Sequence, residues 1–192
     1  MLMKIYLVLL KKINRKKYAQ KVYKLREKQL KTLGVKIGED CRIENAKFGS
    51  EPYLITIGNH VTVGANVQFV THDGGVWILR EKYPDIDVFG PIEIGDNCFI
   101  GINSIIMPNV KIGENSVVAA GSIVTKNIEA NSIVAGVPAR LIRKTADYEE
   151  KVLRNAFHTK KLNYGEKKSF LVKHFYQNYK KEQGDFYKKY EN

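Results

Sequence analysis

Residues 92–128 read IEIGDNCFIGINSIIMPNVKIGENSVVAAGSIVTKNI and repeat with a period of six. Every sixth residue is a branched aliphatic: Ile94, Ile100, Ile106, Ile112, Val118 and Val124. Three positions after each of these comes a residue type that enters positive-φ conformations at little cost: Asn97, Asn103, Asn109, Asn115, Gly121 and Asn127. A six-residue period matches neither an α-helix nor an ordinary strand. The stretch therefore predicts a parallel β-helix, in which each hexapeptide packs one aliphatic inward and then turns a corner.

The same register begins before this stretch and is interrupted once. It appears at Ile57, Val63 and Phe69, and a degraded copy lies at Ile37 and Ile43. We therefore expect one β-helix domain over residues 34–143. The period lapses over residues 72–91, HDGGVWILREKYPDIDVFGP, which form an aromatic-rich and charged insertion. Long insertions in compact repeats are usually functional, so we expect this loop to carry part of a site rather than to be a solvated excursion.

Charge is distributed unevenly along the 192 residues, whose formal net charge is +12. Residues 1–31 hold eleven Lys or Arg and one acid, residues 32–143 hold nine and twelve, and residues 144–192 hold twelve and seven. The mildly acidic repeat argues against a nucleic-acid groove in the fold itself, and leaves the basic tails as candidates for contact with polyanions. Cys41 and Cys98 lack metal-ligand spacing, which indicates core-packed free thiols in a reducing cytosol.

Both ends of the chain have helical patterns. Residues 1–33 predict a basic amphipathic segment of one or two helices ending near Gly34. Its apolar side either packs on the β-helix or attaches to an anionic membrane surface. The opening MLMKIYLVLL is too short to span a bilayer and lacks a cleavage site. We therefore expect a cytoplasmic protein, with peripheral contact to the inner face of the membrane in the second case. Residues 144–192 predict a C-terminal helical extension, broken at Asn163 to Gly165, whose aromatic residues pack on the β-helix or on a neighbouring subunit.

The motifs, taken in order and in register, resemble those of the hexapeptide-repeat acyltransferases. They are ITIGNHVTVGANVQFVTHDGG at residues 55–75, then IG-D-N-C-F-IG, AAGS-IVTK and AGVPAR, and the similarity covers about residues 35–143. The relevant branch contains galactoside and maltose acetyltransferases and the O-acetyltransferases of bacterial polysaccharide clusters. This resemblance implies a left-handed β-helix that assembles as a homotrimer with active sites between subunits. It also implies acetyl-CoA as the donor, a hydroxyl or amine as the acceptor, and no metal.

The resemblance assigns roles to individual residues, and chemistry supports them. A sugar hydroxyl needs a base as it attacks a thioester, and His72, at the first break in the repeat, suits that task. Asp73 or a backbone carbonyl could orient its imidazole. The amide of Ile102 is the expected donor to the oxyanion. The residues expected to contact CoA are Phe99, Ala120, Thr125, Lys126 and Arg143, with Arg140 a weaker candidate.

The acceptor site is expected in the insertion. Its candidate acceptor-binding residues are Asp73, Trp77, Arg80 and Tyr83, because a sugar ring stacks on aromatic side chains and an acidic group binds a cation. Glu51 is a looser match to the sugar-binding acids of the family, and His60 lies on a corner of the repeat as a structural or exposed residue. The predicted activity is acetyl-CoA-dependent O-acetylation of a saccharide for a surface polysaccharide.

Several alternatives stay open on sequence alone. Within acyltransferases they are N-acetylation of an amino-sugar nucleotide and acetylation of an antibiotic such as a streptogramin. A non-catalytic β-helix scaffold is an alternative of another class. The γ-class carbonic anhydrases share the trimeric fold, but they need three zinc-bound histidines, and the repeat region offers only His60 and His72.

Overall fold

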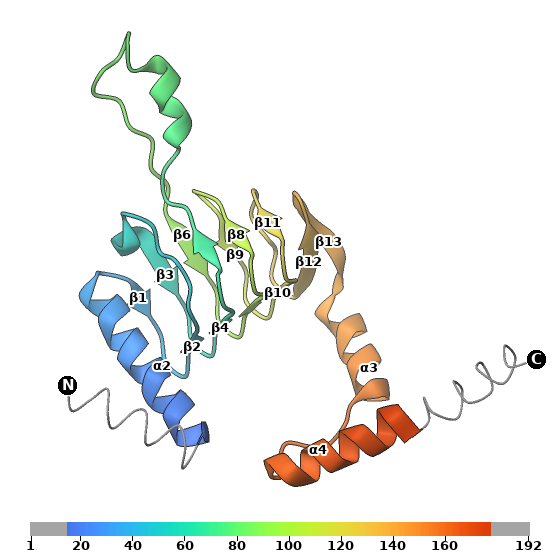
Figure 1. The fold of residues 1–192 in the computed structure, drawn as a ribbon. Helices are drawn as coiled ribbons and strands as arrows, with labels where there is room; N and C mark the ends of the chain where they lie inside the picture. The colour runs from blue at the N-terminus through green and yellow to red at the C-terminus, as the bar shows by residue number, and fades with distance from the viewer. Residues whose placement is uncertain (1–14, 178–192) are drawn as a thin grey trace, which may run out of the picture. The chain divides into compact units, whose positions relative to one another are not determined.

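The repeat of residues 92–128 forms six short parallel strands in the computed structural model, which describes residues 15–177. They are β6 (Ile92–Ile94), β7 (Phe99–Ile100), β8 (Ile105–Ile106), β9 (Lys111–Ile112), β10 (Val117–Val118) and β11 (Ile123–Val124). Preceding coils contribute β1 (Lys36–Ile37), β2 (Arg42–Ile43), β3 (Ile55–Ile57), β4 (Thr62–Val63) and β5 (Gln68–Phe69). Successive strands stack in three columns, so the predicted parallel β-helix is confirmed (Figure 1).

The three columns are three sheets, which form the three sides of the β-helix. Sheet A has the order β1-β3-β6-β9, and sheet C has the order β5-β8-β11. Sheet B runs β2-β4-β7-β10-β12-β13, where β12 (Ser132–Gly136) and β13 (Ala139–Lys144) form an antiparallel hairpin after the last full coil. The first coil reaches sheet C only through an isolated bridge between Lys47 and Gln68.

The inward aliphatics form one continuous core along the β-helix axis. The six from Ile94 to Val124 are at most 3% exposed, and Ile57, Val63 and Phe69 are at most 2% exposed. In the first coil the ring of Phe48 packs against that of Phe69, with 4.9 Å between centroids. Cys98 is buried in the same core and Cys41 lies at its margin, both as free thiols. Each coil buries too little apolar surface to be stable alone, so the stack is the stable unit.

The corners follow the predicted positive-φ residues with one exception. Asn97, Asn103, Asn109, Asn115 and Gly121 all have φ between 53° and 71°. The prediction for Asn127 was wrong: it is absent from the positive-φ residues, and Asn131 takes the left-handed conformation instead. The Asn127 side chain accepts a hydrogen bond from the Lys111 N–H at 2.8 Å. The hexapeptide period therefore ends after β11, where the chain shifts its register to form the closing hairpin.

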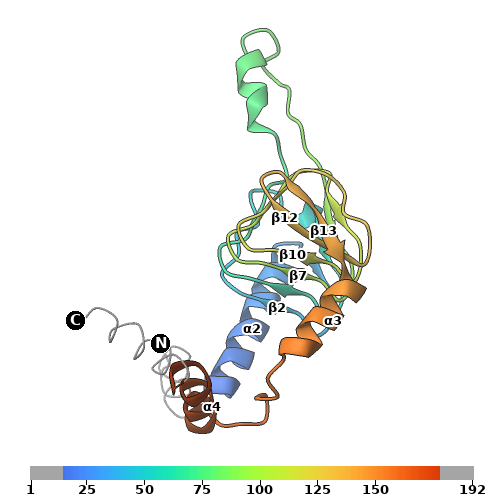
Figure 2. The same cartoon turned by 90° about the vertical axis from the view of Figure 1, so that its right-hand side faces the viewer.

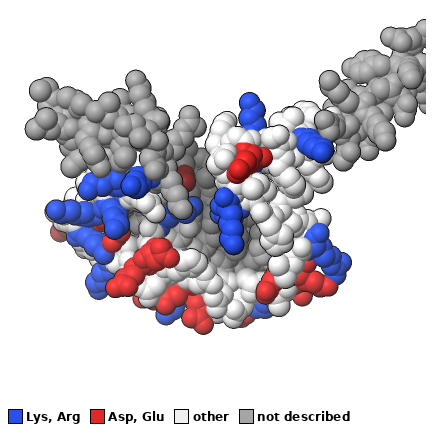
Figure 3. All heavy atoms as spheres, turned by 90° about the horizontal axis from the view of Figure 1, so that it is seen from below, with Lys and Arg blue, Asp and Glu red and all other residues white. Residues whose placement is uncertain are grey.

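Helix α2 (Arg15–Thr32) lies at the N-terminal end of the β-helix (Figures 1 and 2). It ends next to Gly34, whose φ of +93° reverses the chain as expected. Leu30 is buried against the first coil, and the Arg26 guanidinium donates to the Ala46 carbonyl at 2.7 Å. Seen from below, basic side chains gather on the side where α2 lies (Figure 3). The expected helix over residues 1–14 lies outside the described residues.

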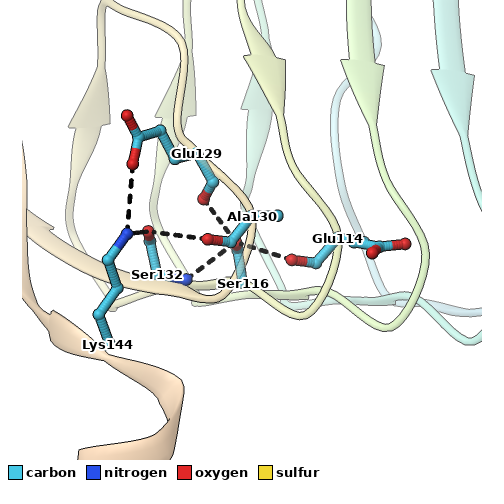
Figure 4. A network of polar contacts seen from close by, with 6 residues as sticks. All are labelled: Glu114, Ser116, Glu129, Ala130, Ser132 and Lys144. Carbon is cyan, nitrogen blue, oxygen red and sulfur yellow. Dashed lines mark hydrogen bonds and ion pairs between the residues drawn. The ribbon is translucent and has the colours of Figure 1, made fainter.

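A polar network ties the closing hairpin to the last coil (Figure 4). The buried Ser116 hydroxyl donates to the Glu129 carbonyl at 3.1 Å and accepts from the Ser132 N–H at 3.3 Å. Lys144 of β13 contacts the Ser132 hydroxyl at 3.4 Å and the Glu129 carboxylate at 3.2 Å. These contacts satisfy polar groups that the end of the stack otherwise leaves without a coil above them.

The chain divides into two compact units, residues 1–150 and 151–192. The helices that follow the β-helix are α3 (Thr145–Asn155), α4 (Tyr164–Val172) and a π-helical turn, η3 (Lys173–Gln177). The predicted break falls over residues 156–163 instead of 163–165, because Asn163 and Glu166 form a capping box that starts α4. Within this unit His174 is flanked by the rings of Phe157, Phe170 and Phe175. Tyr179, Phe186, Tyr187 and Tyr190 lie outside the described residues.

None of the helices described between residues 15 and 177 combines the length and hydropathy of a membrane span.

Close stacking at the corners yields a direct test of the fold. A Cβ at Gly95 meets the Glu114 backbone nitrogen at 2.7 Å, closer than packed atoms allow. Gly95→Ala should therefore lower the free energy of unfolding by about 1–3 kcal/mol, measured by denaturant titration. Gly74→Ala is the matched control, since nothing lies within 4 Å of its added carbon. Equal stability of the two variants would contradict the stacking described.

Candidate active site

The insertion leaves the β-helix just after β5 and returns just before β6. Its two arms pair where they leave the prism: His72 and Phe89 form an antiparallel bridge, and the Gly90 N–H donates to the Thr71 carbonyl at 2.8 Å. Beyond this stem the loop projects away from the coils and contains the 3₁₀ turn η2 (Gly74–Leu79) (Figures 1 and 2). The stem therefore fixes His72 at the corner between sheets C and A, at the base of a projecting loop.

His72 is paired with a carboxylate from the preceding loop. Its Nδ1 lies 2.9 Å from Oε2 of Glu51, which comes directly before the short 3₁₀ turn η1 (Pro52–Leu54). The hydroxyl of the fully buried Thr71 donates to the same oxygen at 2.7 Å. These hydrogen bonds from Thr71 and His72 hold the pKa of the Glu51 carboxyl below its ordinary value of 4.5. Glu51 is therefore ionised at neutral pH and is a strong acceptor for His72.

This pairing fixes the tautomer of the imidazole. Because ionised Glu51 can only accept, the proton lies on Nδ1 and the lone pair on Nε2. The His72 side chain is 42% exposed, whereas that of Glu51 is 13% exposed. The arrangement presents an oriented base to solvent with its carboxylate partner behind it, which suits removal of a proton from a hydroxyl.

Asp73, proposed from sequence as a residue that orients His72, has a different contact. Its carboxylate accepts from the Gly75 N–H at 2.8 Å and caps η2. Sequence reasoning considered Glu51 only as a loose match to a sugar-binding acid. The signal that was present is a carboxylate immediately before the second coil, 21 positions before the histidine.

The predicted oxyanion donor lies at a different corner, between sheets B and C. Ile102 follows β7 there, and its carbonyl accepts from the Gly121 N–H of the next coil at 2.9 Å. Among residues 15–177, no group accepts from the Ile102 N–H. A Cβ at Gly64 would meet the Ile102 nitrogen at 2.8 Å, so the glycine below keeps this amide uncovered. Ala120 is exposed one coil along, in the same column as Ile102. The corner offers a rigid N–H beside a small side chain.

The His72 imidazole and the Ile102 amide therefore lie at opposite ends of sheet C. Ile102 precedes β8, whereas His72 follows β5, the neighbouring strand of that sheet. Crossing the sheet takes the chain on the order of 15 Å. A base and an oxyanion donor must both lie about 3 Å from reacting atoms. Within one chain these two groups cannot serve the same thioester.

The other predicted CoA-contacting residues fall into two groups. The Phe99 side chain, 46% exposed, lies on the outer face of sheet B and lines a hollow of about 560 Å³ with Thr62 and Val117. Lys126 lies just beyond β11 and lines a second hollow, of about 420 Å³, together with Arg140. Thr125 is exposed beside Lys126, and Arg143 pairs with Ile133 in the hairpin without lining either hollow. The structure groups Lys126 with Arg140 rather than with Arg143.

The remaining candidate residues of the insertion are exposed, and Trp77 lies in η2. Trp77 is 76% exposed, and Tyr83 is 46% exposed with the Lys82 ammonium 5.1 Å from its ring centre. Arg80 is paired with Asp87 at 2.6 Å. Their exposure leaves them available to a saccharide or a neighbouring chain, and their role as acceptor-binding residues stays a prediction.

Between residues 15 and 177, no three His, Cys, Asp or Glu side chains come together as a metal site would require. His60 lies at a corner with φ of +53°, and its Nδ1 lies 2.8 Å from Oδ1 of Asn97, 37 residues along the chain.

Comparisons with known proteins match this architecture. Residues 91–126 match the family described as bacterial transferase hexapeptide (six repeats). Protein CapG of Staphylococcus aureus is 57% identical over 157 residues, which cover 80% of this chain and 91% of that protein. Galactoside O-acetyltransferase of Escherichia coli is 42% identical over 52% of this chain, and the match spans about half of that enzyme's length, 49%.

A solved structure resembles the β-helix as well. The hexapeptide-repeat containing acetyltransferase VCA0836 of Vibrio cholerae superposes with a TM-score of 0.52 and 34% identity, covering 58% of this chain and 62% of that one. The fold class predicted from sequence, a left-handed parallel β-helix with helical flanks, is confirmed by this likeness together with the three-sheet topology.

The Glu51 pairing predicts a pH-dependent contribution to stability. Because the folded-state pKa of Glu51 lies below 4.5, its stabilising effect is full above pH 4.5 and is lost as the pH falls through the folded-state value. Glu51→Gln should therefore lower the thermal midpoint at neutral pH, and the difference from the unmodified chain should shrink in acid. Glu81→Gln, at an exposed position, is the control, and it should leave the thermal midpoint unchanged at both neutral and acid pH. A Glu51→Gln deficit that is the same at neutral and acid pH would contradict the pairing.

Proposed function

The chain belongs to the bacterial hexapeptide-repeat transferases, and on that premise we propose that it transfers an acetyl group from acetyl-CoA to a hydroxyl group of a saccharide. The observation that carries this proposal is the His72 and Glu51 pair, an oriented imidazole at the corner where residues 72–91 interrupt the repeat. The relative named galactoside O-acetyltransferase supports a saccharide as the acceptor class. The proposed setting is the synthesis of a surface polysaccharide, and the proposed location is the cytoplasm.

His72 acts as the general base in this proposal. Its Nε2 takes the proton from the acceptor hydroxyl as the new ester bond to the acetyl carbon forms, and the CoA thiolate leaves. The imidazolium that results is stabilised by ionised Glu51 on the other nitrogen, 2.9 Å away. Glu51 thus positions the base, and Thr71 in turn holds the Glu51 carboxylate at 2.7 Å. A base of this kind contributes about 10²–10⁴-fold to the rate.

The donor is bound along the β-helix edge in this proposal. The Ile102 N–H donates to the carbonyl oxygen of the thioester as negative charge develops on it, without any need for the backbone to reorganise. The small side chain of Ala120 leaves room for the pantetheine arm, and Phe99 packs beside it. Lys126 and Thr125 bind the CoA phosphates, joined by Arg140, which shares a hollow with Lys126, and by Arg143 at the outer end.

The proposed assembly is a homotrimer with active sites between chains, and the separation of the two corners supports it. The corner between sheets B and C supplies the oxyanion donor, and the corner between sheets C and A supplies the base. A site that needs both can form only where one corner of a chain meets the other corner of its neighbour. A closed ring of three chains provides three such junctions. The exposed side chains of Ile102 and Phe99, 49% and 46% exposed, support a covered position in the assembly.

The alternatives within this family differ in the acceptor. An amino-sugar nucleotide or an antibiotic needs the same donor site and the same base, so these alternatives are separated by acceptor profiling. We propose the saccharide hydroxyl because the insertion presents Trp77 and Tyr83, aromatic faces that suit a sugar ring. A scaffold without catalytic function would bind no acetyl-CoA.

Matched histidine substitutions test the base. His72→Asn retains a side-chain amide that can donate to Glu51 but has no basic nitrogen, so acetyl transfer to a saccharide should fall by about 10²–10⁴-fold. Affinity for acetyl-CoA should stay within a factor of about two, since His72 acts on the acceptor. His60→Asn is the control, because asparagine also suits its positive-φ corner. Comparable turnover by the His72→Asn and His60→Asn variants would contradict the assignment of His72 as the general base.

Mixing two inactive chains tests the shared site. His72→Asn removes the base from one corner, and Ala120→Trp fills the donor channel at the other, so each homotrimer should be inactive. In trimers assembled at random from equal amounts of both, about one quarter of the sites combine two intact corners. We therefore expect recovery of about a quarter of the unmodified activity after co-expression. No recovery, with mixed trimers verified by mass, would place the site within one chain.

A further inference from the structure

Helix α2 has a stripe of lysines along one face. Its lysines recur in steps of four and three residues: Lys17, Lys21, Lys24, Lys28 and Lys31. At 100° per residue these positions fall within an arc of about 80° on the helix. The stripe runs along the helix for about 21 Å, and all five side chains are exposed. A single acid, Glu27, lies in the helix, and it pairs with Lys31 at 2.7 Å.

The stripe is held in a fixed orientation on the β-helix. Leu30 and Arg26 lie on the opposite side of α2, where Leu30 is buried and Arg26 donates to the Ala46 carbonyl. The Arg42 guanidinium, from β2, lies 5.6 Å from the ring centre of Tyr23. Lys17, Lys21 and Lys24 line one wall of a groove of about 910 Å³, and Arg42 lines the other. Two acids, Glu27 and Asp40, line the same groove, so the cationic surface is that of the helix itself.

Such a stripe has an energetic cost unless an anionic partner covers it. Like charges three and four residues apart on a helix repel one another and lower its stability. The mildly acidic β-helix domain, with nine basic and twelve acidic residues over 32–143, does not require so many cations on α2. The stripe itself contains lysines only, which are strongly hydrated point charges, whereas bidentate recognition of a single phosphate favours arginine. The pattern suits an extended anionic surface better than one small ligand.

Apolar residues adjoin the stripe. Leu25 lies beside the lysines on the helix surface, Val22 lies farther round toward Arg26, and both are only half-buried. In the sequence, α2 follows the apolar stretch MLMKIYLVLL of residues 1–10. Lysines beside apolar side chains are typical of helices that lie in the interface of an anionic membrane. A soluble polyanion would bind the lysines through charge alone and would gain nothing from apolar residues beside them.

We propose that the lysine face of α2 binds the surface of an anionic phospholipid membrane. This binding is independent of acetyl transfer, because none of the α2 residues belongs to the candidate active site. It would hold the β-helix at the bilayer surface, where an acceptor saccharide carried on a lipid is accessible. Each lysine near such a surface strengthens binding by roughly fivefold, so three lysines account for roughly 100-fold.

Vesicle co-sedimentation of the full chain tests this proposal. We expect binding to phosphatidylcholine vesicles that contain about one third phosphatidylglycerol, little binding to pure phosphatidylcholine, and weaker binding as salt is raised. The variant Lys21→Gln, Lys24→Gln, Lys28→Gln should lose affinity by roughly 100-fold while retaining its helix content and its activity on a soluble acceptor. Glutamine preserves helix propensity.

The control removes the same charge elsewhere. Lys160→Gln, Lys161→Gln, Lys167→Gln changes three exposed lysines of the second unit and should bind vesicles like the unmodified chain. Absence of binding to anionic vesicles, or an equal loss in both triple variants, would overturn the proposal. Preferential binding of soluble polyphosphate, with vesicles unable to compete, would also overturn it and identify a soluble polyanion as the partner.

Discussion

The hydrogen bonds between successive coils are the constraint on which the rest of the structure depends. Each strand pairs with the strands of neighbouring coils in a fixed register: the Phe99 N–H donates to the Ser116 carbonyl of the next coil at 3.0 Å, and the Gly101 N–H donates to the Val118 carbonyl at 2.8 Å. A strand of two residues buries little apolar surface alone, so stability comes from the stacking of many coils in this register. It also sorts side chains into columns. The inward aliphatics meet in one core, and the amide of Ile102 comes to lie in line with Ala120.

The candidate site arises where this register is interrupted. The insertion leaves the stack at Thr71, whose buried hydroxyl meets Glu51 and so couples the loop stem to the entry of the second coil. The oriented imidazole therefore depends on two departures from the repeat, the loop that contains Glu51 and the loop that begins at His72. In the proposed mechanism, the periodic part of the fold provides a rigid support and the backbone donor at Ile102, while the aperiodic parts provide the base, His72. In that mechanism, their separation across sheet C requires a site that is shared between neighbouring chains.

Sequence predicted the features that depend on the period. Ile94 to Val124 pack inward and Asn97 to Gly121 form corners because each of these positions is determined by its own hexapeptide. The prediction that Asn127 forms a corner was wrong, because the closing hairpin of β12 and β13 ends the repeat before that position. Glu51 was not assigned to His72 because the pairing joins residues 21 positions apart across two loops, which no local pattern specifies. No local pattern shows that Arg140 rather than Arg143 shares a hollow with Lys126, because the register of the β12–β13 hairpin decides it.

Acetyl transfer requires a donor site for acetyl-CoA, and calorimetric titration of the unmodified protein with acetyl-CoA and with its dephospho form tests for that site most directly. We predict saturable binding of acetyl-CoA, and weaker binding of the form that lacks the 3′-phosphate, because Lys126 and Arg140 line one hollow as cations suited to it. Binding of neither compound would contradict acetyl transfer and favour a scaffold. Equal binding of both would retain the donor but remove the 3′-phosphate contact from the proposed site.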